Sequence, residues 1–173
     1  MTFFSDKMKI VIVGKSSSGK DFLKNELVKQ KGLRPGISCT TRPPRKGEKD
    51  GETYHFISPI EFERGIFKEY FLEWQIFNGW YYGTRKQDWE KANVFIMTPL
   101  GIEDIISQIE GVTTVYLDID LETRVERMNK RIGNADSVER RIIADEKDFQ
   151  NFSCYTIRTT NPLFKINDIW KLL

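Results

Sequence analysis

The chain has 173 residues, of which 39% are hydrophobic, so it can bury one α/β core with a small insertion but not two full domains. Its 27 Lys and Arg residues nearly balance 25 Asp and Glu residues, so net charge indicates neither a nucleic-acid-binding protein nor an acidic tail. Cys39 and Cys154 lie far apart and are expected to be free thiols of a reducing compartment. No apolar run approaches the ~20 residues of a membrane span, and the start (MTFFSDKMKI) does not resemble a signal peptide. We therefore expect a cytoplasmic protein with no membrane or nucleic-acid partner.

The first predicted elements are a strand, a loop and a helix, in the order that a phosphate-binding loop requires. Lys9–Val13 (KIVIV) is a β-branched run typical of a buried parallel strand, and Asp21–Lys31 has apolar residues at helical spacing. Between them, Gly14–Asp21 (GKSSSGKD) has the spacing GxxxxGK, with Asp21 where such loops end in Ser or Thr. Glycines let successive N–H groups point at one phosphate chain, and the lysine reaches the outer phosphates. The alternative is an ordinary Ser/Gly turn between two elements.

The following segments predict a strand, an exposed loop and a small aromatic insertion. Ile37–Thr41 is predicted to be the second core strand, whereas Arg42–Gly51 is too rich in Pro, Gly and charge for a core. From Thr53 to Gly83 the chain has short aromatic strand-like pieces, TYHF, FLEWQIF and WYYG. A helix is predicted to begin at Ser58, because Ser58 and Glu61 have capping-box spacing. Together these pieces predict a mostly β insertion of about 50 residues.

Helices and strands alternate regularly after the insertion. The predicted helices are Arg85–Asn93, Leu100–Ile109, Leu121–Arg131 and Ser137–Phe149, and the predicted strands are Val94–Met97, Thr113–Asp118 and Tyr155–Thr159. Asn161 and Pro162 predict the N-cap and first position of a closing helix. Strands separated by helices indicate a parallel sheet covered on both faces, with ligands at the carboxyl ends of the strands.

A second set of polar side chains suits a phosphate. Arg42 and Arg45 bracket two prolines in TTRPPR, and the stiff Pro-Pro pair holds the two guanidinium groups in a fixed relation. Tyr54 and Tyr82 can each donate a phenolic hydrogen bond to the same phosphate. The alternative is a solvated charged loop beside core aromatic residues. A stacking platform for nucleic acid is a weaker interpretation of these aromatic residues, and the lone His55 has no partner at metal or triad spacing.

Two stretches resemble signatures of the guanylate kinase family. Ser38–Ser58 (SCTTRPPRKGEKDGETYHFIS) is similar to the first signature, and Phe71–Thr84 (FLEWQIFNGWYYGT) is similar to the second, including its Glu-Trp and Tyr-Tyr-Gly. With the phosphate-binding loop at the expected distance, the resemblance covers nearly the whole chain. It implies a P-loop NTPase-type α/β fold, a parallel sheet flanked by helices with a small, mostly β acceptor-binding insertion and a helical lid. It implies one domain over 1–173, with a core (1–36, 94–126 and 150–173), an acceptor-binding subdomain (about 37–90) and a lid (about 127–149).

The resemblance implies an enzyme that transfers the γ-phosphate of ATP to GMP or dGMP in the presence of Mg²⁺. The implied ATP-binding residues are Gly14, Lys15, Ser16, Ser17, Ser18, Gly19, Lys20 and Asp21. The implied GMP-binding residues are Arg42, Arg45, Tyr54 and Tyr82 at the phosphate, Ser38, Glu73 and Thr84 at the base, and Thr98 at the base or sugar. A carboxylate such as Glu73 can accept hydrogen bonds from N1–H and N2–H₂ of guanine, a donor pair that adenine lacks. The wrong base would leave that carboxylate unpaired.

The charged stretch RMNKRIGNADSVERRI resembles the mobile lid of the family. The resemblance implies that Lys20, Arg42, Arg131 and Arg141 are catalytic, because phosphoryl transfer depends on placing cations around the transferring group and on excluding water. The alternative is two solvated helices with charge pairs at i,i+4 spacing, and Arg127 fits this alternative best.

Three positions depart from the family pattern. Family members usually have Ser or Thr at the position of Asp21 and acidic residues at the positions of Ile96 and Thr98. Asp21 can itself bind Mg²⁺, but its charge would oppose the donor phosphates unless the metal intervenes. Two alternatives therefore stay open, a kinase of another small phosphate ester such as a sugar phosphate and a non-catalytic binding module. Glu73 and its neighbours at the base oppose the first and Lys20 opposes the second, while a monomer and a homodimer are equally compatible with the sequence.

Overall fold

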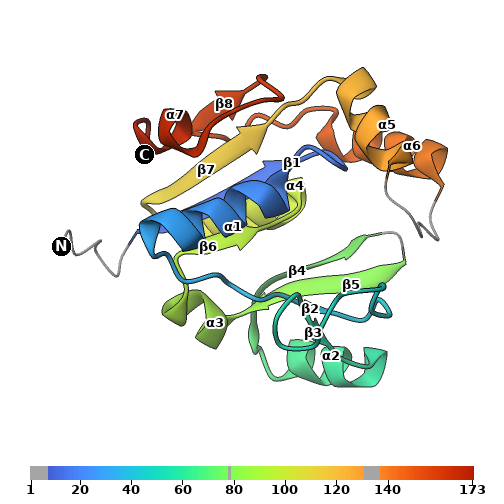
Figure 1. Cartoon of the computed structure of the whole chain (residues 1–173). Helices are drawn as coiled ribbons and strands as arrows, with labels where there is room; N and C mark the ends of the chain where they lie inside the picture. Colours follow the sequence, from blue (N-terminus) through green and yellow to red (C-terminus); the bar gives the residue numbers. More distant parts are fainter. Residues whose placement is uncertain (1–7, 78, 131–136) are drawn as a thin grey trace.

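Two four-stranded sheets organise the residues that the computed structural model describes, 8–77, 79–130 and 137–173 (Figure 1). The larger sheet has the order β6-β1-β7-β8, and all its strands are parallel. The strands are β1 (Lys9–Gly14), β6 (Val94–Ile96), β7 (Val112–Leu117) and β8 (Ile157–Thr159). Because they are parallel, their carboxyl ends lie at one edge of the sheet, where the loops that follow them meet.

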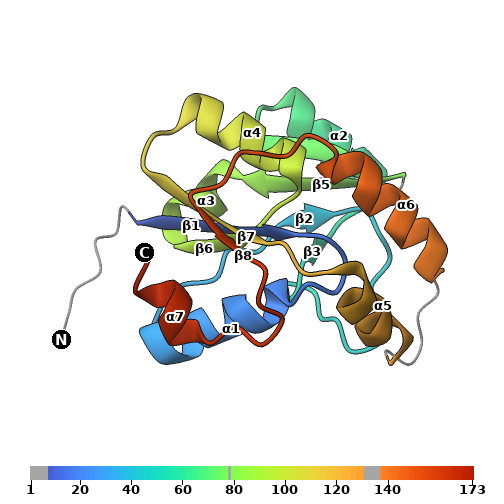
Figure 2. The ribbon, with the colours of Figure 1, turned by 90° about the horizontal axis from the view of Figure 1, so that it is seen from above.

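Helices cover both faces of the larger sheet, which confirms the predicted α/β class (Figure 2). They are α1 (Lys20–Lys31), α4 (Pro99–Gln108), α5 (Leu121–Asn129), α6 (Val138–Phe149) and α7 (Ile166–Trp170). α1 and α7 lie on one face, and α4 lies on the other. In β1, Ile10 and Ile12 join the core beneath α1, whereas Val11 and Val13 join the core beneath α4. A strand buried on both faces in this way needs apolar residues at successive positions, which explains the run KIVIV.

The smaller sheet has the order β3-β2-β5-β4, and the predicted aromatic pieces supply three of these strands, β3, β4 and β5. Its strands are β2 (Cys39–Thr40), β3 (His55–Phe56), β4 (Phe71–Phe77) and β5 (Trp80–Arg85). One face is covered by α2 (Pro59–Phe67), whose Phe62 stacks on Phe71 and Tyr81 with ring centroids 4.2 and 4.9 Å away. The capping box between Ser58 and Glu61 at the start of α2 is present as predicted.

The smaller sheet returns to the larger one through α3 (Lys86–Lys91), and Lys9 holds this junction. Lys9 is only 8% exposed, and its Nζ donates to the carbonyl oxygens of Trp89 and Ala92, the latter at 2.5 Å. These carbonyls belong to the C-terminal end of α3, where a helix attracts positive charge. Lys9 at the start of β1 therefore ties the end of α3 to the larger sheet.

Two predicted elements are wrong. Ile37–Thr41 is not a core strand, because only Cys39–Thr40 forms a strand and it pairs with β3 and β5 of the smaller sheet. The closing helix does not begin at Asn161 and Pro162. Asn161 Oδ1 instead accepts from Leu163 N–H in a turn that buries Phe164, and α7 begins only at Ile166. In the described residues, no helix has both the length and the apolar character needed to cross a membrane.

Candidate active site

The loop between β1 and α1 has the curled backbone of a phosphate-binding site. Gly19 and Ser17 both have positive φ, 105° and 61°, and Gly19 caps α1. A Cβ on Gly14 would lie 2.5 Å from Ser18 Oγ and 2.8 Å from the carbonyl oxygen of Leu117, so the tight turn requires glycine there. Lys20 Nζ donates to the carbonyl oxygens of Gly14 and Lys15 at 2.6 and 3.1 Å, which places its ammonium within the curl.

A hydroxyl in this loop points to a ligand. The side-chain oxygens of Ser17 and Ser18 are buried and have no hydrogen-bond partner among the described residues, and of the two residues Ser17 borders a cavity. A buried hydroxyl without a partner is costly, and a bound nucleotide phosphate would supply an acceptor for Ser17.

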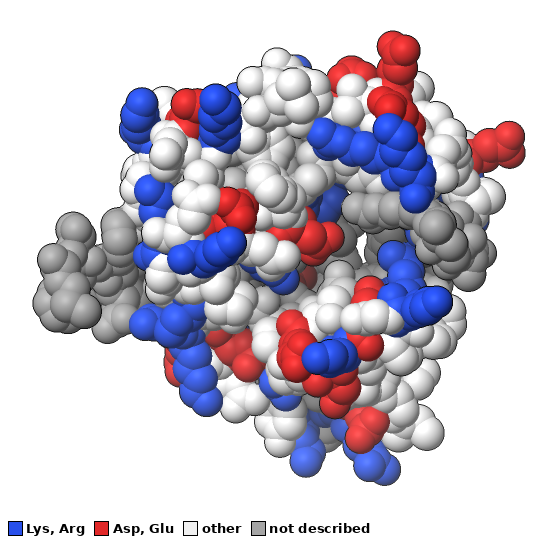
Figure 3. Space-filling view, viewed as in Figure 1, with Lys and Arg blue, Asp and Glu red and all other residues white. Residues whose placement is uncertain are grey.

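A cavity of about 970 Å³ opens between this loop and the smaller sheet, and Figure 3 shows side chains of both charges around the hollow. The predicted residues that line it are Gly14, Ser16, Ser17, Gly19, Lys20, Asp21, Ser38, Arg42, Arg45, Tyr54, Glu73, Tyr82, Thr98 and Arg141. Lys15 points instead to Glu146, with Nζ 2.8 Å from its carboxylate, while Ser18 is fully buried within the loop. Thr84 is buried behind the cavity wall, and Arg131 lies outside the described residues.

The arginine side of the cavity is preorganised by an acid that the sequence analysis did not single out. Glu48 accepts two hydrogen bonds from Arg42 and one from the backbone N–H of Arg45. Burial opposes the charge on Glu48, but these hydrogen bonds outweigh it and hold the pKa of the carboxyl below its ordinary value. The Arg42 guanidinium also lies over the ring of Tyr54, 5.6 Å from its centroid. Burial raises the pKa of Tyr54 to about 12, so its phenol remains a hydrogen-bond donor at neutral pH.

Glu73 lines the other end of the cavity, and the pKa of its carboxyl is raised. It is 8% exposed, and burial raises its pKa to about 7. Thr84 lies directly opposite Glu73 in the pairing of β4 with β5. Thr98 caps α4 by accepting from the N–H of Gly101 at 3.1 Å, and a Cβ on Gly101 would lie 2.8 Å from Glu73 Oε2. The N-terminal turn of α4 therefore packs directly against the carboxyl group, where its dipole favours the charged form.

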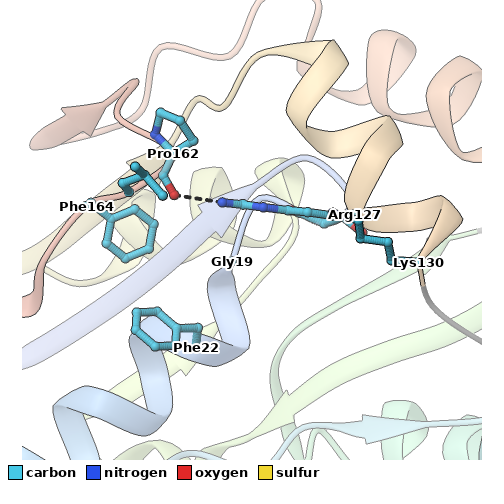
Figure 4. Close-up of a pocket in the computed structure, with 8 residues that line it drawn as sticks. Gly19, Phe22, Arg127, Lys130, Pro162 and Phe164 are labelled. Carbon is cyan, nitrogen blue, oxygen red and sulfur yellow. Dashed lines mark hydrogen bonds between the residues drawn. The ribbon is translucent and has the colours of Figure 1, made fainter.

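A second cavity of about 560 Å³ lies on the other side of the loop (Figure 4). Arg127 crosses it and donates to the carbonyl oxygens of Ser17 and Ser18 at 3.2 Å and of Pro162 at 2.7 Å. The contacts of Arg127 therefore reach across the chain, unlike the local pairing that the alternative interpretation of this stretch implies. Phe22 and Phe164 supply an apolar wall, with ring centroids 6.0 Å apart. An apolar cavity beside a phosphate-binding loop suits the base of the donor nucleotide. The sequence did not indicate these residues, although Phe22 lies in the first turn of a helix that follows a phosphate-binding loop.

The residues near the loop fit a magnesium ion that phosphates would help to bind. In residues 8–77, 79–130 and 137–173, no group of three or more His, Cys, Asp or Glu side chains is arranged to hold a metal. Asp21 lies on the first turn of α1 and lines the large cavity. One carboxylate together with substrate phosphates and water is a usual environment for Mg²⁺.

A parallel α/β core with a GxxxxGK loop, facing a second sheet that presents arginines, tyrosines and a buried carboxyl, defines a P-loop phosphotransferase of small phosphate-bearing acceptors. Residues 6–166 match the guanylate kinase family model, and the chain belongs to the guanylate kinase family.

The guanylate kinase of Sulfurimonas denitrificans is 34% identical over 164 residues, which cover 88% of this chain and 79% of that protein. The guanylate kinase of Onion yellows phytoplasma is 36% identical over 127 residues, which cover 72% of this chain and 52% of that protein. The crystal structure of guanylate kinase from Anaplasma phagocytophilum has the same fold, with a TM-score of 0.68 at 18% identity over 98% of this chain and 84% of that one.

Proposed function

We propose that the protein transfers the γ-phosphate of ATP to the phosphate of GMP or dGMP and releases ADP and the nucleoside diphosphate. The observation that carries this proposal is the cavity lined on one side by the phosphate-binding loop and on the other by Arg42, Arg45, Tyr54, Tyr82 and Glu73. Membership of the guanylate kinase family supports the same reaction. An oxygen of the acceptor phosphate attacks the γ-phosphorus, the bond to the β–γ bridging oxygen breaks, and ADP leaves with the electron pair.

In this proposal one end of the cavity binds the donor nucleotide and the other end binds the acceptor. The loop Gly14–Asp21 binds the donor phosphates through its N–H groups and Lys20, while the cavity beside Arg127 takes the adenine. Arg42 and Arg45, with Tyr54 and Tyr82, bind the acceptor phosphate.

Ser38 and Glu73 recognise guanine, Thr84 supports Glu73 from the buried position opposite it, and Thr98 binds the sugar or base edge. The ionised carboxylate of Glu73 accepts N1–H and N2–H₂, so adenine leaves it unpaired in a buried site.

Cations placed around the transferring group do the catalysis. We assign Lys20, Arg42, Arg131 and Arg141 to this task, since charge builds on the equatorial oxygens of the phosphoryl group as it moves. Mg²⁺, held by Asp21 and the phosphates, would neutralise further charge on the β- and γ-phosphates. Residues 1–36, 94–126 and 150–173 form the core in this proposal, about 37–90 bind the acceptor, and about 127–149 act as the lid.

The proposed setting is the cytoplasm, as a monomer or homodimer that acts on small-molecule nucleotides rather than nucleic acid. Cys39 and Cys154 are both free thiols, as expected in a reducing compartment.

The test is ADP release in a coupled assay with ATP, Mg²⁺ and each common nucleoside monophosphate, together with a sugar phosphate. GMP and dGMP are expected to stimulate ADP release far more than AMP, CMP or UMP. Equal or absent stimulation by all of them would refute the proposal, and stimulation by the sugar phosphate alone would favour the alternative kinase. Absence of ATP binding in the presence of Mg²⁺ would instead favour the non-catalytic module. Glu73→Gln should abolish the preference for GMP, whereas Glu63→Gln, on an exposed position of α2, should leave it intact.

A further inference from the structure

The carboxylate of Asp145 lies where three segments meet: helix α6, which carries it, helix α5 and the phosphate-binding loop. Its oxygens accept the backbone N–H of Ser16 at 2.9 and 3.0 Å and the hydroxyl of Ser16 at 3.0 Å. Oδ2 also accepts from Nη1 of Arg124 on α5 at 2.9 Å. Asp145 and Arg124 are 4% and 2% exposed, so both charges are shielded from water.

Stability alone does not account for an ion pair at this position. A buried pair contributes little compared with well-packed apolar residues of the same volume, because both ions lose their hydration. Arg124 is further satisfied by donating through Nε to the carbonyl oxygen of Ile119 at 3.0 Å. Arg124 thus pairs with the carboxylate that accepts from Ser16, and hydrogen bonds to a carboxylate are stronger than those between neutral groups.

The position of Asp145 on α6 connects the loop to the cavity. Asp145 follows Arg141 by four residues, so both lie on one face of α6, and both line the cavity between the sheets. Helix α6 meets the loop a second time through Glu146, the next residue, which accepts from Lys15 Nζ at 2.8 Å. The contact between Asp145 and Ser16 therefore joins the phosphate-binding loop to the helix that carries Arg141.

We propose that Asp145 is a positioning residue for phosphoryl transfer. By fixing Ser16 to α6, it holds the phosphate-binding loop and Arg141 in the relation that the transferring group requires, while Arg124 only compensates its charge. This inference rests on the proposed function. A displacement of about 1 Å between reacting groups and their binding residues can cost ~100-fold in rate, so a loose loop should lower kcat.

Two double variants separate positioning from stability. Arg124→Leu/Asp145→Asn and Arg124→Leu/Asp145→Ala both remove the buried ion pair, but only asparagine keeps an oxygen that can accept the N–H of Ser16. We expect both to unfold at similar urea concentrations. The asparagine variant should have kcat within about threefold of the wild type, and the alanine variant should have kcat lower by ~30-fold and bind ATP ~10-fold more weakly. KM for GMP should stay the same, because the acceptor side is untouched.

Equal kcat and equal ATP affinity in the two double variants would overturn the inference. A wild-type protein that does not phosphorylate GMP would refute the proposed function instead, and ATP affinity would then decide the role of Asp145. If the alanine variant does not fold, Ser16→Ala gives a second measurement, because it removes the hydroxyl contact and leaves the buried pair intact. That variant should lower kcat about threefold, and an unchanged kcat would contradict the inference.

Discussion

Arg42 and Glu48 form a two-point ion pair inside the acceptor half of the cavity. Nη2 of Arg42 lies 2.8 Å from Oε1 and 2.9 Å from Oε2 of Glu48, and Oε2 also accepts the backbone N–H of Arg45 at 2.6 Å. Glu48 thus holds the Pro43-Pro44 segment at both ends and fixes the direction of the Arg42 side chain.

Glu48→Ala is expected to raise KM for GMP by ~10-fold, because Arg42 then has to be ordered by the substrate itself. KM for ATP should change less than twofold, since the donor loop is not in contact with Glu48. Steady-state kinetics with each substrate varied in turn provides the measurement. Glu52→Ala is the matched control, because Glu52 is exposed and forms its ion pair with exposed Lys49 at 3.4 Å. The same KM for GMP in both variants would contradict the assigned role of Glu48.

GMP binding should depend on pH through Glu73. Burial raises the pKa of its carboxyl to about 7, and the protonated form cannot accept both guanine donors. KM for GMP is therefore expected to rise by ~10-fold per pH unit well below 7 and to be constant above 8. A pH series of initial rates tests this, and a flat profile between pH 5.5 and 8, values chosen to bracket the pKa of about 7, would count against it.

The same carboxyl has the opposite effect on stability. A pKa raised above the usual 4.5 means that the folded protein binds the proton more tightly than the unfolded chain does. The contribution of Glu73 to stability should therefore fall as pH rises from about 4.5 to about 7, and Glu73→Gln should remove this slope. Urea unfolding at several pH values, compared with Glu63→Gln, measures it. A wild-type slope that persists in Glu73→Gln would assign it to another group.

The charge of Asp21 should make ATP binding unusually dependent on magnesium. Its carboxylate faces the cavity from the first turn of α1, where it repels the phosphates unless a cation intervenes. Asp21→Asn is expected to bind ATP more tightly than the wild type in EDTA and more weakly in excess Mg²⁺, by about threefold in each case. Calorimetric titration under both conditions measures the change, and Asp21→Ser should behave similarly. A shift in the same direction under both conditions would exclude a metal-linked role.

Arg127 should support the donor site rather than the acceptor site. It joins the carbonyl oxygens of Ser17, Ser18 and Pro162 across the second cavity. Arg127→Met is expected to raise KM for ATP by ~10-fold with little effect on KM for GMP. Lys130→Met is a suitable control, since Lys130 borders the same cavity but forms an ion pair with Glu126 on its own helix. Equal effects of the two variants would show that Arg127 contributes only charge.

Local signals predicted those parts of the fold that local interactions determine. The strand KIVIV, the glycine loop and the capping box at Ser58 each depend on neighbours within a few residues, and the structure has all three. Strand β2 was assigned to the wrong sheet because its partners, such as Tyr82 opposite Thr40, are distant in sequence. The strand has two residues, and their sequence does not indicate which sheet the strand joins.

The contacts of charged residues on helices could not be predicted from the sequence either. Asp145, Arg124 and Arg127 lie in stretches so rich in charge that a solvated face explains them equally well, and only the folded structure shows their contacts across the chain. The predicted start of the closing helix was wrong for a different reason. Asn161 and Pro162 have the composition of a helix start, but burying Phe164 requires a turn there first.

The position of Lys9 at the junction between the two sheets affects how they can move relative to each other. It ties α3 at the first residue of β1, whereas Gly14 and the nucleotide loop lie at the last, ~16 Å away at the usual strand rise. The Lys9 junction thus fastens the end of α3 at the end of β1 remote from the loop, and we expect it to act as a hinge about which the acceptor half rotates toward the loop. We expect small-angle scattering to show a smaller radius of gyration when both nucleotides are bound than with either alone. Closure of this kind would bring the two phosphates together while the core beneath α1 and α4 stays packed.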